Sequence, residues 1–472
     1  MYSNFNKVLS LIICLFIVSN TLFAQEASPY SRYGIGSLGD YNFVQSASMG
    51  GLGTAYRAPE GISFVNPASY TALSMTSFEA GANISMDRLK TATLKDSRGT
   101  GGLNYIALSF PIGKKIGISA GLIPLSKKDY FLTDTAAFVG TDGELLAKEF
   151  EGSGGINHLY FGAAYKIKGL SVGANFAYLF GKLNNNSFAY PLQETFKPDP
   201  FSSTTWKSNE LQVKGIYYNL GAQYQLKLKG FAKESGKDTI RMTIGVSGNP
   251  SIKLGKLSTL DEGTYTFNTS QFYGNLPRGE NQGIKDYVEE SLNFNGVDTI
   301  AQNIGQKTQV KIPGVLNVGL NFDQGIKWQA GIDFRFQPWK NYKGYENNGA
   351  SVLQNSWRIG LGGEILPDPS FKGKFGSKLK YRAGISYGQT QVVANNTSIN
   401  EFTANIGFGI PINNAISNDE GYLFKVASYS FNLGLEVGTR GTTKNDLLKE
   451  NFFRFKFGFS FNDRWFVRRK FN

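Results

Sequence analysis

Apolar and polar residues alternate one by one along many segments of this chain, which is the pattern of a β-strand with two different faces. In segment 453–461, five phenylalanines share one face, and arginine, lysine, glycine and serine share the other. The same alternation recurs near 216–226, 328–336, 381–387 and 429–437. Five aromatic rings on one face would promote aggregation in water but suit contact with lipid. We therefore expect strands with one lipid-facing side and one lumen-facing side.

Fourteen segments carry this pattern, an even number as expected for a bacterial barrel built from one chain. Closure is required because an open sheet edge would leave backbone groups unpaired in hydrocarbon. A soluble β-sandwich also alternates, but the length of these runs and the frequent charges on the polar side favour a barrel. The expected strands are 74–86, 102–112, 115–130, 155–167, 169–184, 210–229, 239–255, 308–322, 326–339, 354–365, 378–391, 399–413, 424–440 and 450–461.

The connections between these strands fall into two classes. Those after even-numbered strands are mostly short, whereas those after odd-numbered strands are often long, as at 131–154, 185–209 and 256–307. Outer-membrane barrels have short periplasmic turns and long outer loops. The sequence therefore predicts an all-β fold, a 14-stranded antiparallel transmembrane β-barrel over residues 74–472, with 256–307 as a long outer loop.

The first 24 residues have the features of a cleavable signal peptide. Lys7 precedes an apolar stretch from Val8 to Val18, and the small residue Ala24 precedes the expected cleavage point. This stretch is shorter than the roughly 20 residues that a membrane-spanning helix needs. Because Cys14 is the only cysteine, the mature chain is expected to have no disulfide and no thiolate metal site.

Composition adds little chemistry to this picture. The formal net charge is +13, but the basic residues sit singly at alternate strand positions, which argues against a nucleic-acid partner. The single histidine, His158, cannot build a metal site without cysteines, and the Gly34–Gly39 match to a dinucleotide fingerprint has neither a preceding strand nor a following helix pattern. We expect no catalytic residue, no metal and no cofactor, and therefore no enzyme.

Residues 25–73 precede the first expected strand and have a distinct character. The small residues of 48–55, including Gly50, Gly51 and Gly53, allow close packing against another backbone. In Asn66-Pro67-Ala68, asparagine suits a helix N-cap and proline the first helical position. The segment is either a capped short helix ahead of the barrel or a compact plug inside it.

These residues resemble the FadL family of outer-membrane transporters for hydrophobic compounds. The resemblance rests on Gly-Gly-Leu-Gly-Thr-Ala at 50–55 followed by Asn66-Pro67-Ala68, and on the stretch 311–320 with its continuation to 342. The beginning at 28–34 and the ending at 462–466 also resemble barrels of Bacteroidetes. The resemblance implies a 14-stranded barrel whose N-terminal hatch, with Asn-Pro-Ala inside it, fills the lumen. It also implies passage of fatty acids or aromatic hydrocarbons through a gap beside a kinked third strand.

Two local features agree with transport. Pro124 follows Gly121 in the expected third strand, and proline belongs at edges or bulges, so these two residues are candidates for a lateral opening. An ordinary strand-end proline is the alternative. In the long loop, apolar residues spaced as on one face of a helix could form a ligand groove or pack on neighbouring loops. These groove candidates are Ile284, Tyr287, Val288 and Leu292.

The inward positions include Asp333, Arg335, Arg382, Arg454 and Lys456, so no continuous apolar tunnel is visible. These charges could pair with the hatch or bind a carboxylate. We expect an outer-membrane location, contact with lipid, a monomer, and passive uptake of hydrophobic compounds such as long-chain fatty acids. The alternative is a barrel of the same superfamily that does not transport and instead binds a protein partner in a secretion or surface-assembly machine.

Overall fold

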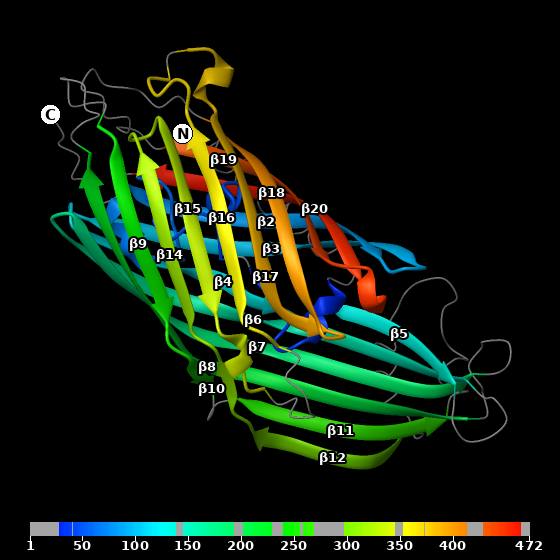
Figure 1. Ribbon diagram of the computed structural model, residues 1–472. Helices are drawn as coiled ribbons and strands as arrows, with labels where there is room; N and C mark the ends of the chain where they lie inside the picture. Colours follow the sequence, from blue (N-terminus) through cyan, green and yellow to red (C-terminus); the bar gives the residue numbers. More distant parts are fainter. Residues whose placement is uncertain are drawn as a thin grey trace, which may run out of the picture.

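The computed structural model describes residues 28–39, 41–137, 145–192, 202–228, 239–254, 258–268, 297–344, 353–371, 373–412 and 428–463. Within these residues the chain forms a closed antiparallel barrel of fourteen strands, as predicted (Figure 1). The first strand closes the ring by pairing with the last along its length, from Thr76 with Asp463 to Lys90 with Lys449. The wall strands are β2 (Thr76–Lys90), β3 (Lys95–Ile112), β4 (Ile116–Lys127), β6 (Leu145–Ile167), β7 (Leu170–Leu192), β8 (Ser203–Lys227), β9 (Arg241–Asn249), β14 (Val315–Asp323), β15 (Trp328–Gln337), β16 (Ser356–Ile365), β17 (Lys380–Ala394), β18 (Thr397–Pro411), β19 (Ser428–Gly441) and β20 (Lys449–Asp463).

Shorter elements accompany the wall. They are the strands β1 (Ser37–Leu38), β5 (Tyr130–Ala137), β10 (Ile252–Leu254), β11 (Thr259–Asn268), β12 (Val297–Lys307) and β13 (Val310–Ile312), and the helices η1 (Pro29–Arg32), α2 (Val44–Ala47), η2 (Pro67–Ala72), η4 (Trp339–Asn341), η5 (Phe375–Lys378) and η6 (Lys444–Asp446). No helix among the described residues is both long and apolar enough to span a membrane.

The alternation seen in the sequence places the residues as expected. On β20, Phe455 and Phe457 are 37% and 43% exposed, whereas Lys456 between them is 7% exposed. On β17, Ile385 and Tyr387 face outward in the same way, while Arg382 is buried in the lumen. The outer wall is therefore a belt of apolar side chains, as contact with hydrocarbon requires.

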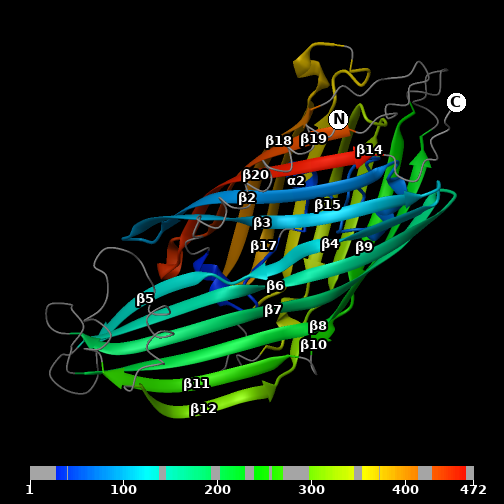
Figure 2. The same ribbon diagram turned by 180° about the vertical axis from the view of Figure 1, so that it is seen from behind.

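One side of the barrel wall continues well beyond the rest as a sheet. Strands β6, β7 and β8 have 23, 23 and 25 residues, against about 9–11 needed to cross a bilayer. Their extra length pairs with β5 at one end, and β8 pairs with β11, which pairs with β12. Figures 1 and 2 show this six-stranded extension projecting from the barrel.

The expected loops 131–154, 185–209 and 256–307 were therefore wrong in part, because strand residues occupy much of each. Outside the membrane a strand has no lipid face, so its polar residues lie on both sides and the alternation weakens. The candidate groove residues Ile284, Tyr287, Val288 and Leu292 lie outside the described residues, as does the expected signal peptide.

Candidate functional site

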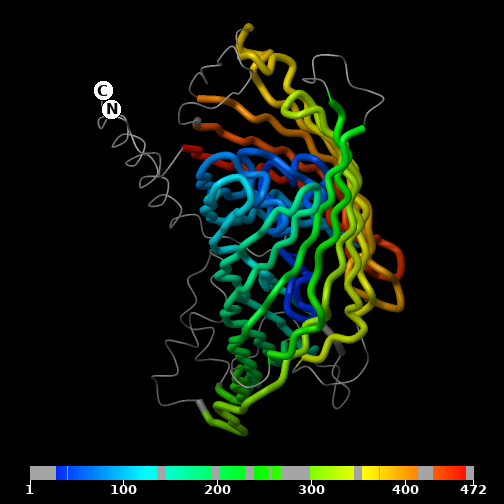
Figure 3. The backbone as a smooth tube through the Cα atoms, turned by 90° about the vertical axis from the view of Figure 1, so that its left-hand side faces the viewer, coloured from blue at the N-terminus to red at the C-terminus, as the bar shows by residue number. Residues whose placement is uncertain are grey.

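The N-terminal segment, residues 28–39 and 41–73, lies inside the ring of strands (Figure 3). Its centre is deeply buried, and Met49, Ala55, Asn66 and Ala68 are at most 1% exposed. It begins with η1, continues through the short helix α2, and ends with η2 directly before β2. The chain thus enters the lumen before it forms the wall.

Inward-facing glycines let the wall approach the backbone of this segment closely. A Cβ atom added at Gly384 would lie 2.2 Å from the amide nitrogen of Gly50, and one at Gly245 would lie 2.2 Å from the Thr54 carbonyl oxygen. Six wall strands have glycines that approach the segment's backbone in this way, and four more have glycines that approach its side chains. We call this set the glycine ring: Gly117, Gly162, Gly173, Gly221, Gly245, Gly319, Gly360, Gly362, Gly384, Gly407 and Gly434.

Polar side chains of the wall bind the backbone of the N-terminal segment. The Asp333 carboxylate accepts hydrogen bonds from the Gly53 and Thr54 amides, each at 2.7 Å. The Gln223 side chain donates to the Thr54 carbonyl at 2.9 Å, and Glu79 accepts from the Ile62 amide at 2.9 Å. Because buried backbone groups need partners, these bonds hold an irregular segment in place where neither helix nor sheet could satisfy it.

The Asn66-Pro67-Ala68 motif caps η2, as the sequence predicted. The Asn66 side chain accepts a hydrogen bond from the Ala68 amide at 3.1 Å, and Pro67 occupies the first turn. The same asparagine donates to the Thr54 carbonyl at 2.7 Å, and to Ala222 and Val246 carbonyls of the wall at 3.2 and 3.3 Å. One side chain therefore ties the helix start, the glycine-rich stretch and two wall strands together.

Gly121 and Pro124 lie where β4 separates from β3. The β3–β4 pairing ends at Ile106 with Leu122, two residues before Pro124. The register with β6 shifts between Pro124 and Ser126, which marks an irregularity in the strand. Just beyond, β1 of the N-terminal segment pairs with β4, Ser37 with Lys127 and Leu38 with Ser126. The structure thus has a pairing irregularity at Pro124, with a strand of the N-terminal segment beside it; a lateral opening at Gly121 and Pro124 stays a prediction.

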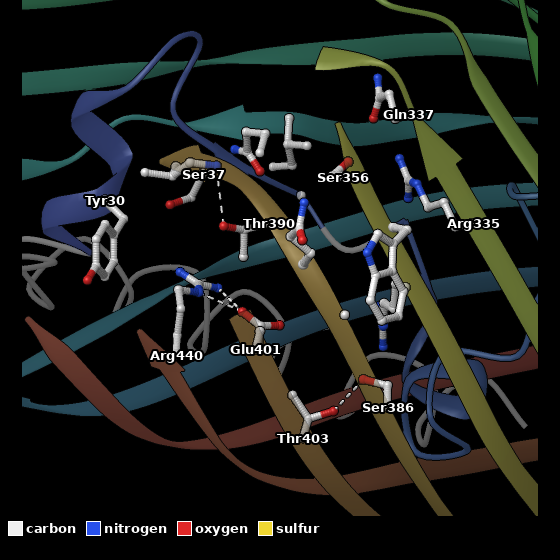
Figure 4. A pocket seen from close by; sticks show the side chains of 18 of the residues that line it. Tyr30, Ser37, Arg335, Gln337, Ser356, Ser386, Thr390, Glu401, Thr403 and Arg440 are labelled. Atoms are coloured by element: carbon white, nitrogen blue, oxygen red, sulfur yellow. Dashed lines mark hydrogen bonds and ion pairs between the residues drawn. The ribbon is translucent and has the colours of Figure 1, made fainter. Parts of the chain in front are cut away.

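A cavity of about 190 Å³ with several charged residues in its lining lies in the lumen next to the N-terminal segment (Figure 4). Arg440 pairs with Glu401 at 2.5 Å, and both Arg454 and Lys456 pair with Glu436, at 2.8 and 2.9 Å. Pockets for apolar ligands are mostly larger and lined by apolar side chains. This cavity is therefore poorly suited to a long hydrocarbon chain.

The tyrosines that the N-terminal segment presents to this region stay neutral. Burial raises the pKa of Tyr41, although the nearby Arg335 guanidinium lowers it in part. That guanidinium lies 4.8 Å from the centre of the Tyr41 ring. Burial, followed by the charge of Glu450, also raises the pKa of Tyr30, whose hydroxyl donates to the Leu448 carbonyl.

The predicted inward charges have structural partners. Asp333 binds the N-terminal segment, and Arg382 pairs with Glu364 at 2.5 Å and donates to Asn432 at 2.8 Å. The glycine ring was not predicted from the sequence, although its glycines lie on ten of the fourteen wall strands. A search for glycines at inward positions of alternating strands would have found it.

Comparison with known proteins supports this architecture. A family model described as BamG matches residues 5–472. No curated protein sequence matches the chain. Among solved structures, a Pseudomonas aeruginosa FadL homologue is 12% identical over 94% of this chain and 100% of its own, with a TM-score of 0.53. The Ralstonia pickettii toluene transporter TbuX is 14% identical over 90% and 99%, with a TM-score of 0.51. The CymD monoaromatic hydrocarbon channel is 14% identical over 92% and 99%, with a TM-score of 0.50. At these identities the likeness shows a shared FadL-like fold.

Proposed function

We propose that this chain, which belongs to the BamG family, is a closed outer-membrane barrel that serves as a docking platform for a protein partner. It crosses the bacterial outer membrane with its fourteen strands. The N-terminal segment acts as a fixed hatch, so the lumen is not a path for solutes. The protein then works without covalent chemistry and is not an enzyme.

The observation that carries this proposal is the fit of the hatch in the glycine ring. Wall glycines approach the hatch backbone on six of the fourteen wall strands, and polar wall side chains hold the hatch from several strands. Close-packed interiors do not deform continuously, so axial passage would require unfolding the hatch. The cavity beside it is small and charged, which supports a role other than storing or conducting apolar ligands.

The six-stranded extension gives the platform its surface. It is carried by β5, β6, β7, β8, β11 and β12 and projects away from the barrel. Its last strand, β12, exposes Ile300 and Ile304 to 62% and 68%. Short turns are expected on the periplasmic side, so the extension faces the cell exterior in this proposal. A Bacteroidetes origin and a surface-assembly role remain predictions from the sequence.

Lateral passage of hydrophobic compounds is the second candidate function. The irregular strand pairing beside Gly121 and Pro124 favours it, and two structural neighbours are described as a monoaromatic hydrocarbon channel and a toluene transporter. In this case an apolar compound would leave the barrel between β3 and β4. The sequence offers no specific evidence for fatty acids over other apolar compounds.

Deleting the gene tests the two candidates against each other. For a docking platform we expect normal uptake of labelled toluene and of labelled oleate by the deletion strain. Extraction of the purified barrel with organic solvent, followed by mass spectrometry, should release no apolar compound at one equivalent per chain. Loss of uptake that the intact gene restores, together with a stoichiometric apolar compound, would instead establish lateral transport.

A further inference from the structure

Positively charged side chains gather at the end of the lumen that lies away from the six-stranded extension. Lys166 and Lys227 lie at the ends of β6 and β8, whose opposite ends belong to the extension. Arg241 begins β9 directly across from Lys227. Lys115 ends the short turn before β4, and its carbonyl accepts from the Lys166 amide at 2.8 Å. We call these four residues, together with Arg57 of the hatch, the basic cluster.

The strand residues of the basic cluster face the lumen and not the lipid. On β6, Ala164 is buried against the interior, while Tyr165 and Ile167 are exposed on the outer wall. Because side chains alternate along a strand, Lys166 shares the inner face with Ala164. On β8, Gln223 donates to the hatch, so Lys227, four residues later, also lies on the inner face. These charges are therefore presented at the mouth of the lumen.

Arg57 brings a guanidinium from the hatch into the same place. It donates to the Gln223 side-chain oxygen at 2.7 Å, to the Thr71 hydroxyl at 3.0 Å and to the Ser171 hydroxyl at 3.2 Å. Ser171 lies directly opposite Lys166 in the β6–β7 pairing. All three acceptors are uncharged. The hatch thus holds a positive charge beside the lysines of the wall without neutralising it.

The basic cluster carries more positive charge than its surroundings balance. The charges of Arg57, Lys227 and Arg241 all act on Lys166. Burial, followed by the charge of Arg241, lowers the pKa of Arg57 to about 10, although Asp323 raises it in part. Within the part of the chain that the structure describes, Asp323 is the one carboxylate that pairs with a member of the cluster, and it pairs with Arg241. Five positive side chains thus face one carboxylate, a formal excess of four.

The neighbouring connection between β8 and β9 does not supply the missing negative charge. Residues 228–240 contain three lysines, one glutamate and one aspartate, so they add one positive charge. Neutralisation therefore calls for an external anion. Cationic clefts attract and concentrate such partners.

The extent of the basic cluster indicates what kind of anion fits it. The cluster reaches from β4 through β6, β7 and β8 to β9, which are consecutive neighbours in the wall. Four steps between strands amount to roughly 19 Å. One phosphate or sulfate contacts only adjacent members of such an arc. An extended polypeptide covers the same distance with about six residues and can present several carboxylates along it.

From this placement we propose that the basic cluster binds an acidic polypeptide segment of the protein partner, whose aspartate and glutamate carboxylates contact the lumen mouth between β4 and β9. Clusters of basic side chains are a recurrent mode of recognising acidic motifs, and hydrogen bonds between ionised groups are the stronger ones. Short turns place this mouth on the periplasmic side. The inference rests on the proposed docking function and names the chemistry of the partner.

Binding of fluorescein-labelled hexaglutamate to the full-length protein in detergent, followed by fluorescence anisotropy, tests the site. We expect saturable binding that weakens as sodium chloride is added, because salt screens exposed charges. Replacing both Lys166 and Lys227 by glutamine should weaken binding at least about fivefold. It should not lower the unfolding temperature, since it removes repulsion. Absence of binding to the unmodified protein would overturn the proposal.

Lys90→Gln combined with Lys95→Gln is the matched control. These lysines pair with each other at the β2–β3 turn, at the other end of the barrel, so this variant loses the same charge and should bind hexaglutamate as the unmodified protein does. Equal affinities of the two double variants would contradict the proposed site. So would displacement of the peptide by inorganic phosphate, or by phosphatidylglycerol vesicles, as effective as displacement by unlabelled hexaglutamate.

Photocross-linking in native outer membranes identifies the occupant. Benzoylphenylalanine in place of Lys227 should capture a partner protein at a segment rich in aspartate and glutamate, whereas the same group in place of Lys95 should not capture that segment. Adducts only to lipid or only to other parts of the same chain would refute the proposal. If a partner complex is recovered but the cluster neither captures it nor binds hexaglutamate, only this inference fails. Absence of any partner overturns the docking function as well.

Discussion

Replacing Gly384 by alanine should strongly destabilise the folded barrel. The added Cβ would lie 2.2 Å from the Gly50 amide nitrogen and 2.3 Å from the Met49 carbonyl carbon, and neither backbone can move without disturbing its other contacts. Overpacking a core typically costs about 1–3 kcal/mol and sometimes more. We expect the temperature at which the compact, fast-migrating form is lost on gels to fall clearly, with a lower yield of folded protein.

The Gly102→Ala variant is the matched control. It makes the same change in another wall strand, where the added methyl group meets open space. This variant should unfold at the temperature of the unmodified protein, within about 0.5 kcal/mol of stability. If Gly384→Ala and Gly102→Ala were equally stable, the hatch would not be clamped by the glycine ring.

Replacing Asp333 by alanine should release the hatch. The carboxylate accepts the buried Gly53 and Thr54 amides, and each buried donor left unpaired costs about 1–3 kcal/mol. Because the barrel pairing itself is not touched, we expect the wall to persist while the hatch becomes open to protease. In planar bilayers, Asp333→Ala should show conductance steps that the unmodified protein lacks.

An exposed aspartate provides the comparison for this second variant. Asp298 lies on the exposed strand β12, so Asp298→Ala removes the same charge without touching the hatch. It should remain closed and resistant to protease. Asp333→Asn should fall between the two, since the amide oxygen can still accept a hydrogen bond. If the Asp333→Ala variant showed no conductance steps and its hatch stayed resistant to protease, the role given to this carboxylate would be contradicted.

The wall was predictable from the sequence because two solvents impose its pattern. Lipid selects apolar residues on one face, as at Phe455 and Phe457, and the lumen selects polar residues such as Lys456 on the other. All fourteen strands follow from that rule. The N-cap at Asn66 was equally predictable because it depends on neighbours two residues away.

The candidate site was harder to predict from the sequence than the wall, because its contacts join residues that are distant in sequence. The hydrogen bond between Asp333 and Gly53 joins residues 280 positions apart, and no local sequence pattern predicts it. Ten of the fourteen wall strands contribute one or two glycines each to the ring, so the ring emerges only when the strands are aligned. Pro124 indicated an irregularity in β4, but the point at which β3 stops pairing with β4 is not visible in the sequence. The alternation is weak in the six-stranded extension, so the sequence predicted loops for much of it.

The most direct test of the docking role is the mass of the protein released intact from native outer membranes with a mild detergent. The docking role of the hatch-closed barrel predicts a defined complex, in which each mature chain carries one equivalent of a protein partner. Native mass spectrometry should recover that complex reproducibly. A homogeneous species containing only the mature chain and a bound apolar compound would contradict the account.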